Sequence, residues 1–194
     1  PTVLFFIIKG SFLFNFFIFI CFLITTYEWL KLSKNNLLKL FGTIFIVISF
    51  YTIFNIRNEF DRDYFHLLLV VIICVSTDIG GYVFGNIFKG PKLTKISPKK
   101  TYSGVIGSFL LSLIFTNLFL DFLSNVETFE FTKEMFLFIL LVSLVSQIGD
   151  IIISYFKRKS KIKDTGTIIP GHGGILDRID GMIFAIPFAY VFFL

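Results

Sequence analysis

Apolar residues fill six stretches of the chain that are each about as long as a membrane-spanning helix. Such a helix needs about 20 mainly apolar residues to cross the hydrocarbon core of a bilayer. Strong alternation of polar and apolar positions, the mark of a membrane β-barrel, is absent. The pattern therefore predicts an all-α, polytopic transmembrane helical bundle. The expected spans are Ser11–Trp29, Asn36–Phe54, Phe65–Phe88, Ser103–Leu123, Glu134–Phe156 and Ile179–Leu194, of which the last is short for a full crossing.

A single integral membrane domain, residues 1–194, accounts for the whole chain. Hydrophobic residues make up 55% of it, above the roughly 45 to 50% that is usual in soluble domains, and no linker or internal repeat interrupts it. The chain begins without Met, and Val3–Ile8 is typical of the tail of a helix. We therefore interpret the sequence as lacking N-terminal spans. Cys21 and Cys74 both lie in apolar runs, which favours packing over a disulfide or zinc site.

The distribution of Lys and Arg predicts how the helices are oriented. Cytoplasmic loops of membrane proteins carry an excess of positive charge. Three segments that must share one side are strongly basic, whereas the opposite side has four basic residues among several acids. We expect the basic side to face the cytoplasm, across a bacterial-type inner (plasma) membrane. Its basic residues are Lys31, Lys34, Lys39, Lys89, Lys92, Lys95, Lys99, Lys100, Lys157, Arg158, Lys159, Lys161, Lys163 and Arg178.

The basic segments also contain most of the loop glycines and prolines. Orientation alone would explain their charge, but it would not explain Gly90-Pro91, Ser97-Pro98 or the run at 170–174. Backbone that can adopt positive φ or approach a ligand closely is what anion-binding loops need. We therefore expect these segments to bind anionic groups. For Lys99 and Lys100, anchoring to anionic lipid is an equally good explanation.

The fifth predicted span carries a polar stripe. Ser143, Gln147, Asp150, Ser154 and Lys157 are three or four residues apart, so they share one face of the helix. For Ser143 alone, bonding between helices is the simpler explanation. An acid within a span is costly unless it pairs, binds a cation or faces water. We therefore interpret Asp150 as a functional residue.

Three further acids are candidates for the same chemistry. Asp78 lies near the middle of the third span, where either a packing role or a ligand role fits, because small glycines follow it. Asp177 and Asp180 are three residues apart at the start of the last span, so both carboxylates can reach one Mg²⁺. A single acid there would be read as a helix cap. His172 lies among glycines, and without a second His or a Cys nearby it does not indicate zinc.

The stretch 154–180 reads SYFKRKSKIKDTGTIIPGHGGILDRID. It resembles, without gaps, the signature of the phosphatidate cytidylyltransferase (CDP-diacylglycerol synthase) family. Residues 77–85 and 96–101 resemble a second characteristic region of that family, and residues 27–30 resemble its early helix end. The resemblance thus covers nearly the whole chain, although family members usually have additional spans at the amino end.

The resemblance implies an enzyme that transfers CMP from CTP to phosphatidate, giving CDP-diacylglycerol and pyrophosphate. It implies Mg²⁺, with a second cation left open, bound by Asp150, Asp177 and Asp180, with Lys157 as a further catalytic residue. The implied partners are CTP, phosphatidate and membrane lipids, without nucleic acid; a homodimer is left open. The implied substrate-binding residues are Ser154, Arg158, Lys163, Asp164, His172, Gly173, Gly174, Arg178, Lys99 and Lys100.

Other functions remain open on the sequence alone. A relative that transfers CMP to another lipid phosphate, such as an archaeal ether lipid, would share the phosphate and metal chemistry. An ion-coupled transporter would also place Asp78 and Asp150 in the membrane, but it gives less reason for a basic loop that ends in paired aspartates. A purely structural subunit gives no reason for the buried acids.

Overall fold

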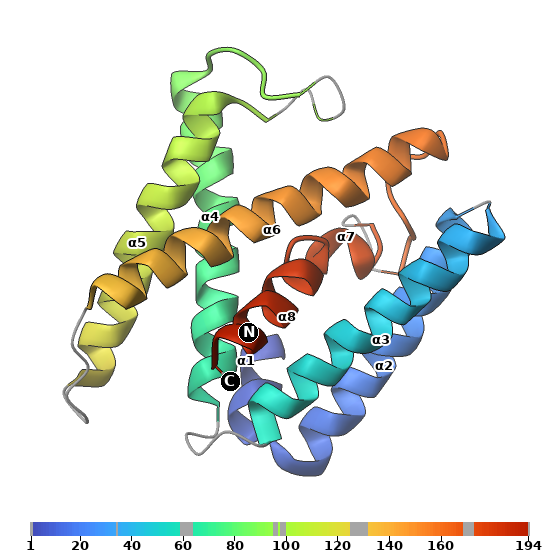
Figure 1. The fold of residues 1–194 in the computed structure, drawn as a ribbon, viewed down its shortest axis with the longest axis horizontal. Helices are drawn as coiled ribbons and strands as arrows, with labels where there is room; N and C mark the ends of the chain where they lie inside the picture. The colour runs from blue at the N-terminus through green and yellow to red at the C-terminus, as the bar shows by residue number, and fades with distance from the viewer. Residues whose placement is uncertain are drawn as a thin grey trace.

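The computed structural model describes residues 2–33, 35–58, 64–94, 97, 100–124, 132–168 and 173–193, and within these ranges the chain forms eight helices (Figure 1). An isolated antiparallel bridge joins Lys92 and Thr101. The expected all-α class is confirmed. The helices are α1 Thr2–Lys9, α2 Ser11–Leu32, α3 Asn36–Asn58, α4 Phe65–Phe88, α5 Tyr102–Ser124, α6 Lys133–Lys159, α7 Leu176–Ile179 and α8 Met182–Phe193.

Five of the expected spans, α2 to α6, are long and apolar enough to cross a membrane. Each begins within a residue of its predicted start, and four of them end one to four residues later than predicted. The sixth differs more, because residues 176–179 form the separate one-turn helix α7 before α8 begins. With 12 residues and a rise of 1.5 Å per residue, α8 is about 18 Å long. It is therefore too short to cross a full bilayer alone.

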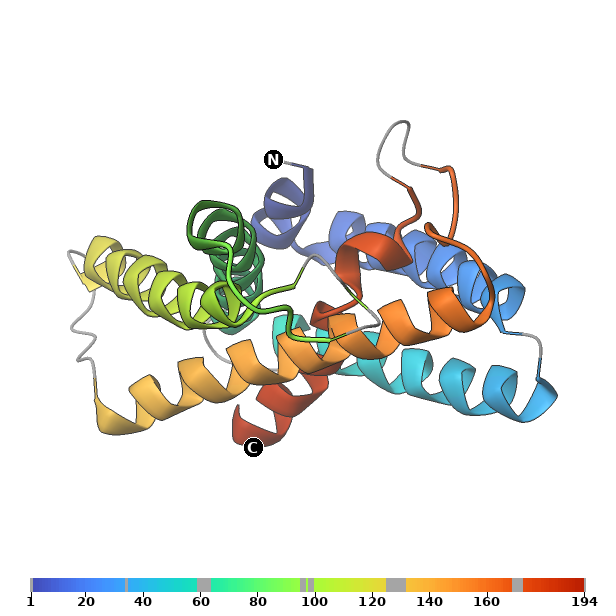
Figure 2. The same ribbon diagram turned by 90° about the horizontal axis from the view of Figure 1, so that it is seen from above.

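The helices form two pairs that α6 and α8 connect. α2 packs on α3 and α4 packs on α5, at opposite ends of the molecule (Figures 1 and 2). α6 runs across from the α4–α5 pair toward the end of the α2–α3 pair where α2 ends and α3 begins, and α8 contacts α3, α4 and α6. The inner positions of α6 therefore face the other helices, and this is where its polar stripe lies.

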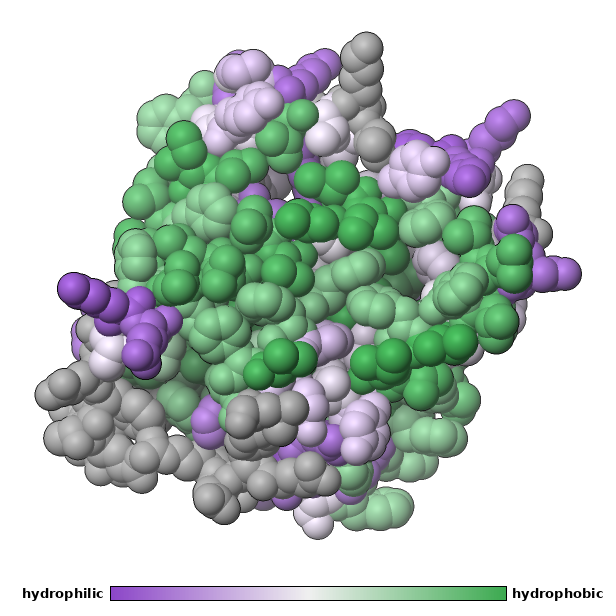
Figure 3. Space-filling view, viewed as in Figure 1, coloured by the Kyte–Doolittle hydropathy of each residue, from purple (hydrophilic) through white to green (hydrophobic). Residues whose placement is uncertain are grey.

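The basic ends of α2 and α6 lie side by side. Ser160, just after α6, donates from Oγ to the carbonyl of Leu32 at the end of α2 at 2.7 Å. Trp29 of α2 stacks edge-on against Phe156 of α6. Apolar residues form a broad band over the visible face, with hydrophilic groups gathered at its edges (Figure 3). This surface is that of a multi-pass membrane protein.

A proline and a serine meet inside the bundle. Pro187 lies within α8 and has no N–H, so the carbonyl of Ile183 loses its usual helical donor. Ser49 of α3 is fully buried and donates from Oγ to that carbonyl at 2.7 Å. It also lies 2.9 Å from the carbonyl of Phe45. The serine thus supplies the hydrogen bond that the proline removes, in a region where lipid offers none.

Glycines let α4 and α5 approach closely. A Cβ atom on Gly80 would lie 2.3 Å from the carbonyl oxygen of Gly107, and one on Gly104 would lie 2.8 Å from the carbonyl oxygen of Gly81. Both clashes are with backbone, so neither can be relieved by turning a side chain. Small residues at helix contacts are typical of membrane proteins, where packing drives association.

We expect Gly80→Ala to destabilise the protein by about 1 to 3 kcal/mol, the usual cost of forcing extra atoms into a packed contact. Gly85→Ala is the matched control on the same helix, because its Cβ would lie 3.2 Å from the Thr101 hydroxyl and 3.9 Å from Gly104 Cα, without a backbone clash. Thermal unfolding in detergent measures the difference. Equal midpoints for the two variants would contradict the tight α4–α5 contact.

Candidate active site

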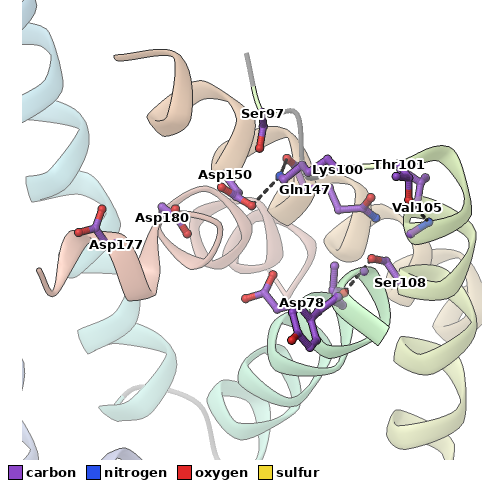
Figure 4. Close-up of a pocket in the computed structure, with 14 residues that line it drawn as sticks. Asp78, Ser97, Lys100, Thr101, Val105, Ser108, Gln147, Asp150, Asp177 and Asp180 are labelled. Carbon is purple, nitrogen blue, oxygen red and sulfur yellow. Dashed lines mark hydrogen bonds and ion pairs between the residues drawn. The ribbon is translucent and has the colours of Figure 1, made fainter. Parts of the chain in front are cut away.

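A cavity of about 340 Å³ lies between α4, α5, α6 and the turn that carries α7 (Figure 4). Four aspartates and one lysine contribute to its wall, which gives it a strongly polar lining within an otherwise apolar bundle. Its lining residues are Thr77, Asp78, Gly81, Tyr82, Ser97, Lys100, Thr101, Gly104, Val105, Ser108, Gln147, Asp150, Asp177 and Asp180.

The polar stripe of α6 faces this cavity and the turn beside it. At its membrane end, Ser143 is fully buried and accepts a hydrogen bond from Thr77 Oγ1 at 2.8 Å, so the interhelical role expected for Ser143 is confirmed. Farther along, Asp150 forms an ion pair with Lys100 at 2.5 Å and accepts from Ser154 Oγ at 3.2 Å. The stripe therefore changes from helix packing to charge pairing along its length.

The loop between α4 and α5 brings Lys100 to Asp150. Gly90 has a φ of +100°, which favours glycine, and it starts a narrow turn of chain. Leu93 N donates to the Lys100 carbonyl at 2.8 Å, and Tyr102 N donates to the Pro91 carbonyl at 3.2 Å. The two arms of the loop are thereby joined, and the Lys100 ammonium group also lies 3.4 Å from the Gln147 carbonyl.

Lys157 joins the two aspartates of the α7 turn. Its ammonium group lies 3.0 Å from Asp177 Oδ1 and 3.7 Å from Asp180 Oδ2. All three side chains are largely buried: the exposed fraction is 12% for Lys157, 6% for Asp177 and 14% for Asp180. The expectation that Asp177 and Asp180 lie close together is met, and a cation already stands between them.

Asp177 is held by its backbone surroundings as well. The N–H groups of Thr165 and Gly174 donate to Oδ2 at 2.8 and 2.9 Å. Burial disfavours the charged form, but these hydrogen bonds and Lys157 outweigh it, so the pKa of Asp177 is lowered from its ordinary value. The side chain therefore stays ionised at neutral pH.

Several predicted substrate-binding residues do not line the cavity. Arg158, Lys163 and Asp164 are exposed. Arg178 lies on the other side of the α7 turn and lines a separate, mainly apolar cavity of about 530 Å³ with Ile179 and residues of α1, α4 and α5. The resemblance implies that these four residues bind substrate, and none of them is part of the cavity wall. Lys99 and His172 lie outside the described residues.

The predicted glycines shape the turn around Asp177. Gly173 has a φ of +86°, a conformation that other residues adopt only with strain. A Cβ on it would also lie 2.8 Å from Asp177 Oδ2. Gly174 supplies one of the two backbone donors to Asp177. Both glycines thus act on the aspartate through the backbone.

The structure adds to what the sequence indicated for two acids. Asp78, for which packing and ligand roles were both open, lines the cavity with Asp150, Asp177 and Asp180. Glu28 of α2 was noted only as part of a helix end, yet it is 1% exposed and bonds to the α7 turn. For both residues, the signal in the sequence is the same: an acidic residue within an apolar helix.

The donor set of the cavity suits a hard divalent cation. Carboxylate oxygens are the usual protein ligands of Mg²⁺, and Asp180 lies close enough to Asp150 for the two carboxyl groups to interact. Within the described ranges, no group of three or more His, Cys, Asp or Glu side chains already has the spacing of a metal site. Lys100 and Lys157 contact the oxygens that a cation would use.

Comparison with known proteins gives a consistent result. The model of the cytidylyltransferase family matches residues 36–194. A phosphatidate cytidylyltransferase of Rickettsia conorii is 38% identical over 162 residues, which are 80% of this chain and 70% of the relative. That of Rickettsia typhi is 39% identical over 168 residues, 82% of this chain and 72% of the relative. That of Haemophilus influenzae is 36% identical over 169 residues, which are 83% of this chain and 59% of the relative.

Proposed function

Because the chain belongs to the cytidylyltransferase family, we propose that it transfers CMP from CTP to phosphatidate, forming CDP-diacylglycerol and pyrophosphate. The observation that carries the proposal is the cavity of four aspartates and Lys100, which lies in the part of the chain that the family model matches. A lipid substrate fits a protein with five helices of membrane-spanning length.

In this reaction an oxygen of the phosphatidate phosphate attacks the α-phosphorus of CTP. The new P–O bond forms as the bond to the β-phosphate oxygen breaks, and pyrophosphate carries the electron pair away. The nucleophile is already an anion, so no general base is needed. Catalysis then rests on positioning and on neutralising negative charge, as in phosphoryl transfer generally.

The lysines of the site supply that neutralisation. Lys100 and Lys157 each point at carboxylates in or beside the cavity, so each ammonium group is placed to move from an aspartate to a phosphate oxygen. Ser154 holds Asp150 by its hydrogen bond. Arg158, Lys163 and Asp164 are exposed, and their roles in binding substrate, like those of Lys99 and His172, stay predictions.

Mg²⁺ fits the acids of the site. We propose that Asp150, Asp177 and Asp180 hold it, with Asp78 as a further carboxylate in the same wall. When bound, the cation would neutralise phosphate charge and polarise the reacting phosphate. The chain's own contribution is to hold these four carboxylates side by side in one cavity wall between the surrounding helices.

The distribution of basic residues indicates which side of the membrane the cavity faces. The basic end of α6 contacts the end of α2 through Ser160 and Leu32, and Lys100 of the basic α4–α5 connection pairs with Asp150 of α6. By the positive-inside rule that end faces the cytoplasm, which holds CTP. We therefore place the protein in a bacterial inner membrane, with the phosphatidate in its inner leaflet and the reaction at its cytoplasmic side.

The direct test is CMP transfer from labelled CTP to phosphatidate in detergent. We expect a labelled lipid product with Mg²⁺, and we expect the rate to fall to background when EDTA replaces Mg²⁺ and to recover when Mg²⁺ is restored. Omitting phosphatidate is the control for transfer to co-purified lipid. Product formed equally with EDTA would contradict the metal assignment.

The alternatives predict other outcomes in the same preparation. Product with an ether lipid phosphate but not with phosphatidate would show that the acceptor is different. Ion-dependent uptake into liposomes without CTP would indicate the transporter. Absence of product with every lipid phosphate, from protein that unfolds cooperatively, would contradict the proposed function.

A further inference from the structure

Glu28 is a buried carboxylate that the chemistry proposed for the cavity does not use. It lies in the last two turns of α2, with 1% of its surface exposed, and it is not among the residues that line the cavity. Burying an ionised group is unfavourable unless hydrogen bonds replace the lost water. The fold must therefore supply those bonds.

Both oxygens of Glu28 accept hydrogen bonds from the segment before and within α7. Ile175 N donates to Oε1 at 3.1 Å, and Leu176 N donates to Oε2 at 2.8 Å. Thr165 Oγ1 donates to Oε2 at 3.0 Å. The residue that precedes α7 provides no side-chain cap of its own, so a carboxylate from a helix far along the sequence takes that place.

The glycines of this segment leave room for the Glu28 carboxylate. A Cβ on Gly166 would lie 2.6 Å from Oε1, and one on Gly174 would lie 2.5 Å from both oxygens. The segment is thus built closely around the side chain. Thr165 is itself 4% exposed, which leaves little space for water to take the place of the carboxylate.

Thr165 and the Gly174–Leu176 segment connect Glu28 directly to Asp177. The hydroxyl of Thr165 bonds to Glu28, while its backbone N–H bonds to Asp177 Oδ2. Gly174 N bonds to the same Asp177 oxygen, and the next two N–H groups bond to Glu28. The two carboxylates therefore share one pair of chain segments, and moving one segment moves the donors of both.

We propose that Glu28 is a positioning residue for CMP transfer: it holds residues 165–166 and 174–176 together so that Asp177 keeps its place in the cavity wall. The inference rests on the proposed function of the cavity. A small displacement of a group in the site lowers the rate steeply. Through Glu28, α2 would therefore affect the reaction although it contributes no residue to the cavity lining.

The test is Glu28→Gln, which keeps the shape of the side chain but turns an amide NH₂ toward backbone N–H donors. We expect kcat to fall by about 10- to 100-fold, the range expected for displaced site groups, with little change in the KM for CTP. Amide hydrogen exchange at residues 173–177 should become faster. Glu134→Gln, at an exposed position in the first turn of α6, is the matched control and should behave as the unmodified protein does.

A threonine pair separates positioning from simple loss of stability. Thr165→Val removes the hydroxyl that bonds to Glu28 and should lower kcat, whereas Thr165→Ser keeps a hydroxyl and should restore most of it. If Glu28→Gln does not fold, this pair decides the question. Unchanged kcat and exchange in Glu28→Gln, or equal kcat in the two Thr165 variants, would overturn the inference.

Failure of the proposed function would look different. The unmodified protein would then make no CDP-diacylglycerol, while hydrogen exchange would still report whether Glu28 holds the Asp177 turn. Faster exchange in Glu28→Gln without any activity in the unmodified protein would contradict the assigned reaction and leave the contact itself supported.

Discussion

Asp177→Asn is expected to lower CMP transfer by about 1,000-fold, the upper end of the range for removing one charged or polar group from a preorganised site. Asparagine keeps an oxygen for the N–H groups of Thr165 and Gly174, so the turn should remain folded. It cannot balance the Lys157 ammonium group or offer a charged oxygen to Mg²⁺. The loss should therefore appear in kcat and not in the amount of folded protein.

The measurement is labelled lipid product per folded protein, with Asp121→Asn as control. Asp121 lies near the end of α5 and is exposed, away from the cavity lining. Retained activity in Asp177→Asn would exclude Asp177 as an essential ligand and leave Asp150 and Asp180 as the acids to test.

Lys157→Met should be almost as damaging. It removes the cation from between Asp177 and Asp180, at a site where 12% of the lysine side chain is exposed. Removing one partner of a buried ion pair lowers the free energy of unfolding by about 3 to 5 kcal/mol, so thermal stability should fall as well. We expect activity per folded protein to drop by about 10² to 10³-fold, because the charge that would neutralise the phosphates is also gone.

Lys159→Met is the matched control on the same helix. Lys159 is exposed, two residues farther along α6, and its ammonium group lies 6.0 Å from the Tyr155 ring centroid. The same change there should leave both stability and activity near those of the unmodified protein. Similar losses in the two variants would show that net charge at this end of α6, and not the contact with the aspartates, is what matters.

Helix positions followed from the sequence because lipid constrains them strongly. In a bilayer the backbone must satisfy its own hydrogen bonds, so a long apolar run such as that of α4 has one solution. The polar stripe of α6 was also predictable, because Asp150 and Lys157 are seven residues apart, which is about two helical turns. Both predictions depend only on local periodicity.

The loops were harder to predict because their directions depend on contacts between distant segments. Arg178 is next to Asp177 in sequence, yet the one-turn helix α7 sends the two side chains to different cavities. The Lys100 contact with Asp150 depends on a narrow loop folding back over α6. Glu28 meets its partners about 140 residues away in the chain, a pairing that no periodicity records.

Ser49 and Pro187 constrain how this sequence can change over generations. The serine hydroxyl serves the Ile183 carbonyl that the proline deprives of a donor. With the proline present, losing the serine leaves that carbonyl unsatisfied, whereas once the proline is lost the serine is free to vary. Substitutions at these two positions therefore have a preferred order, with Pro187 changing first, and the later loss of Ser49 makes a return to proline costly.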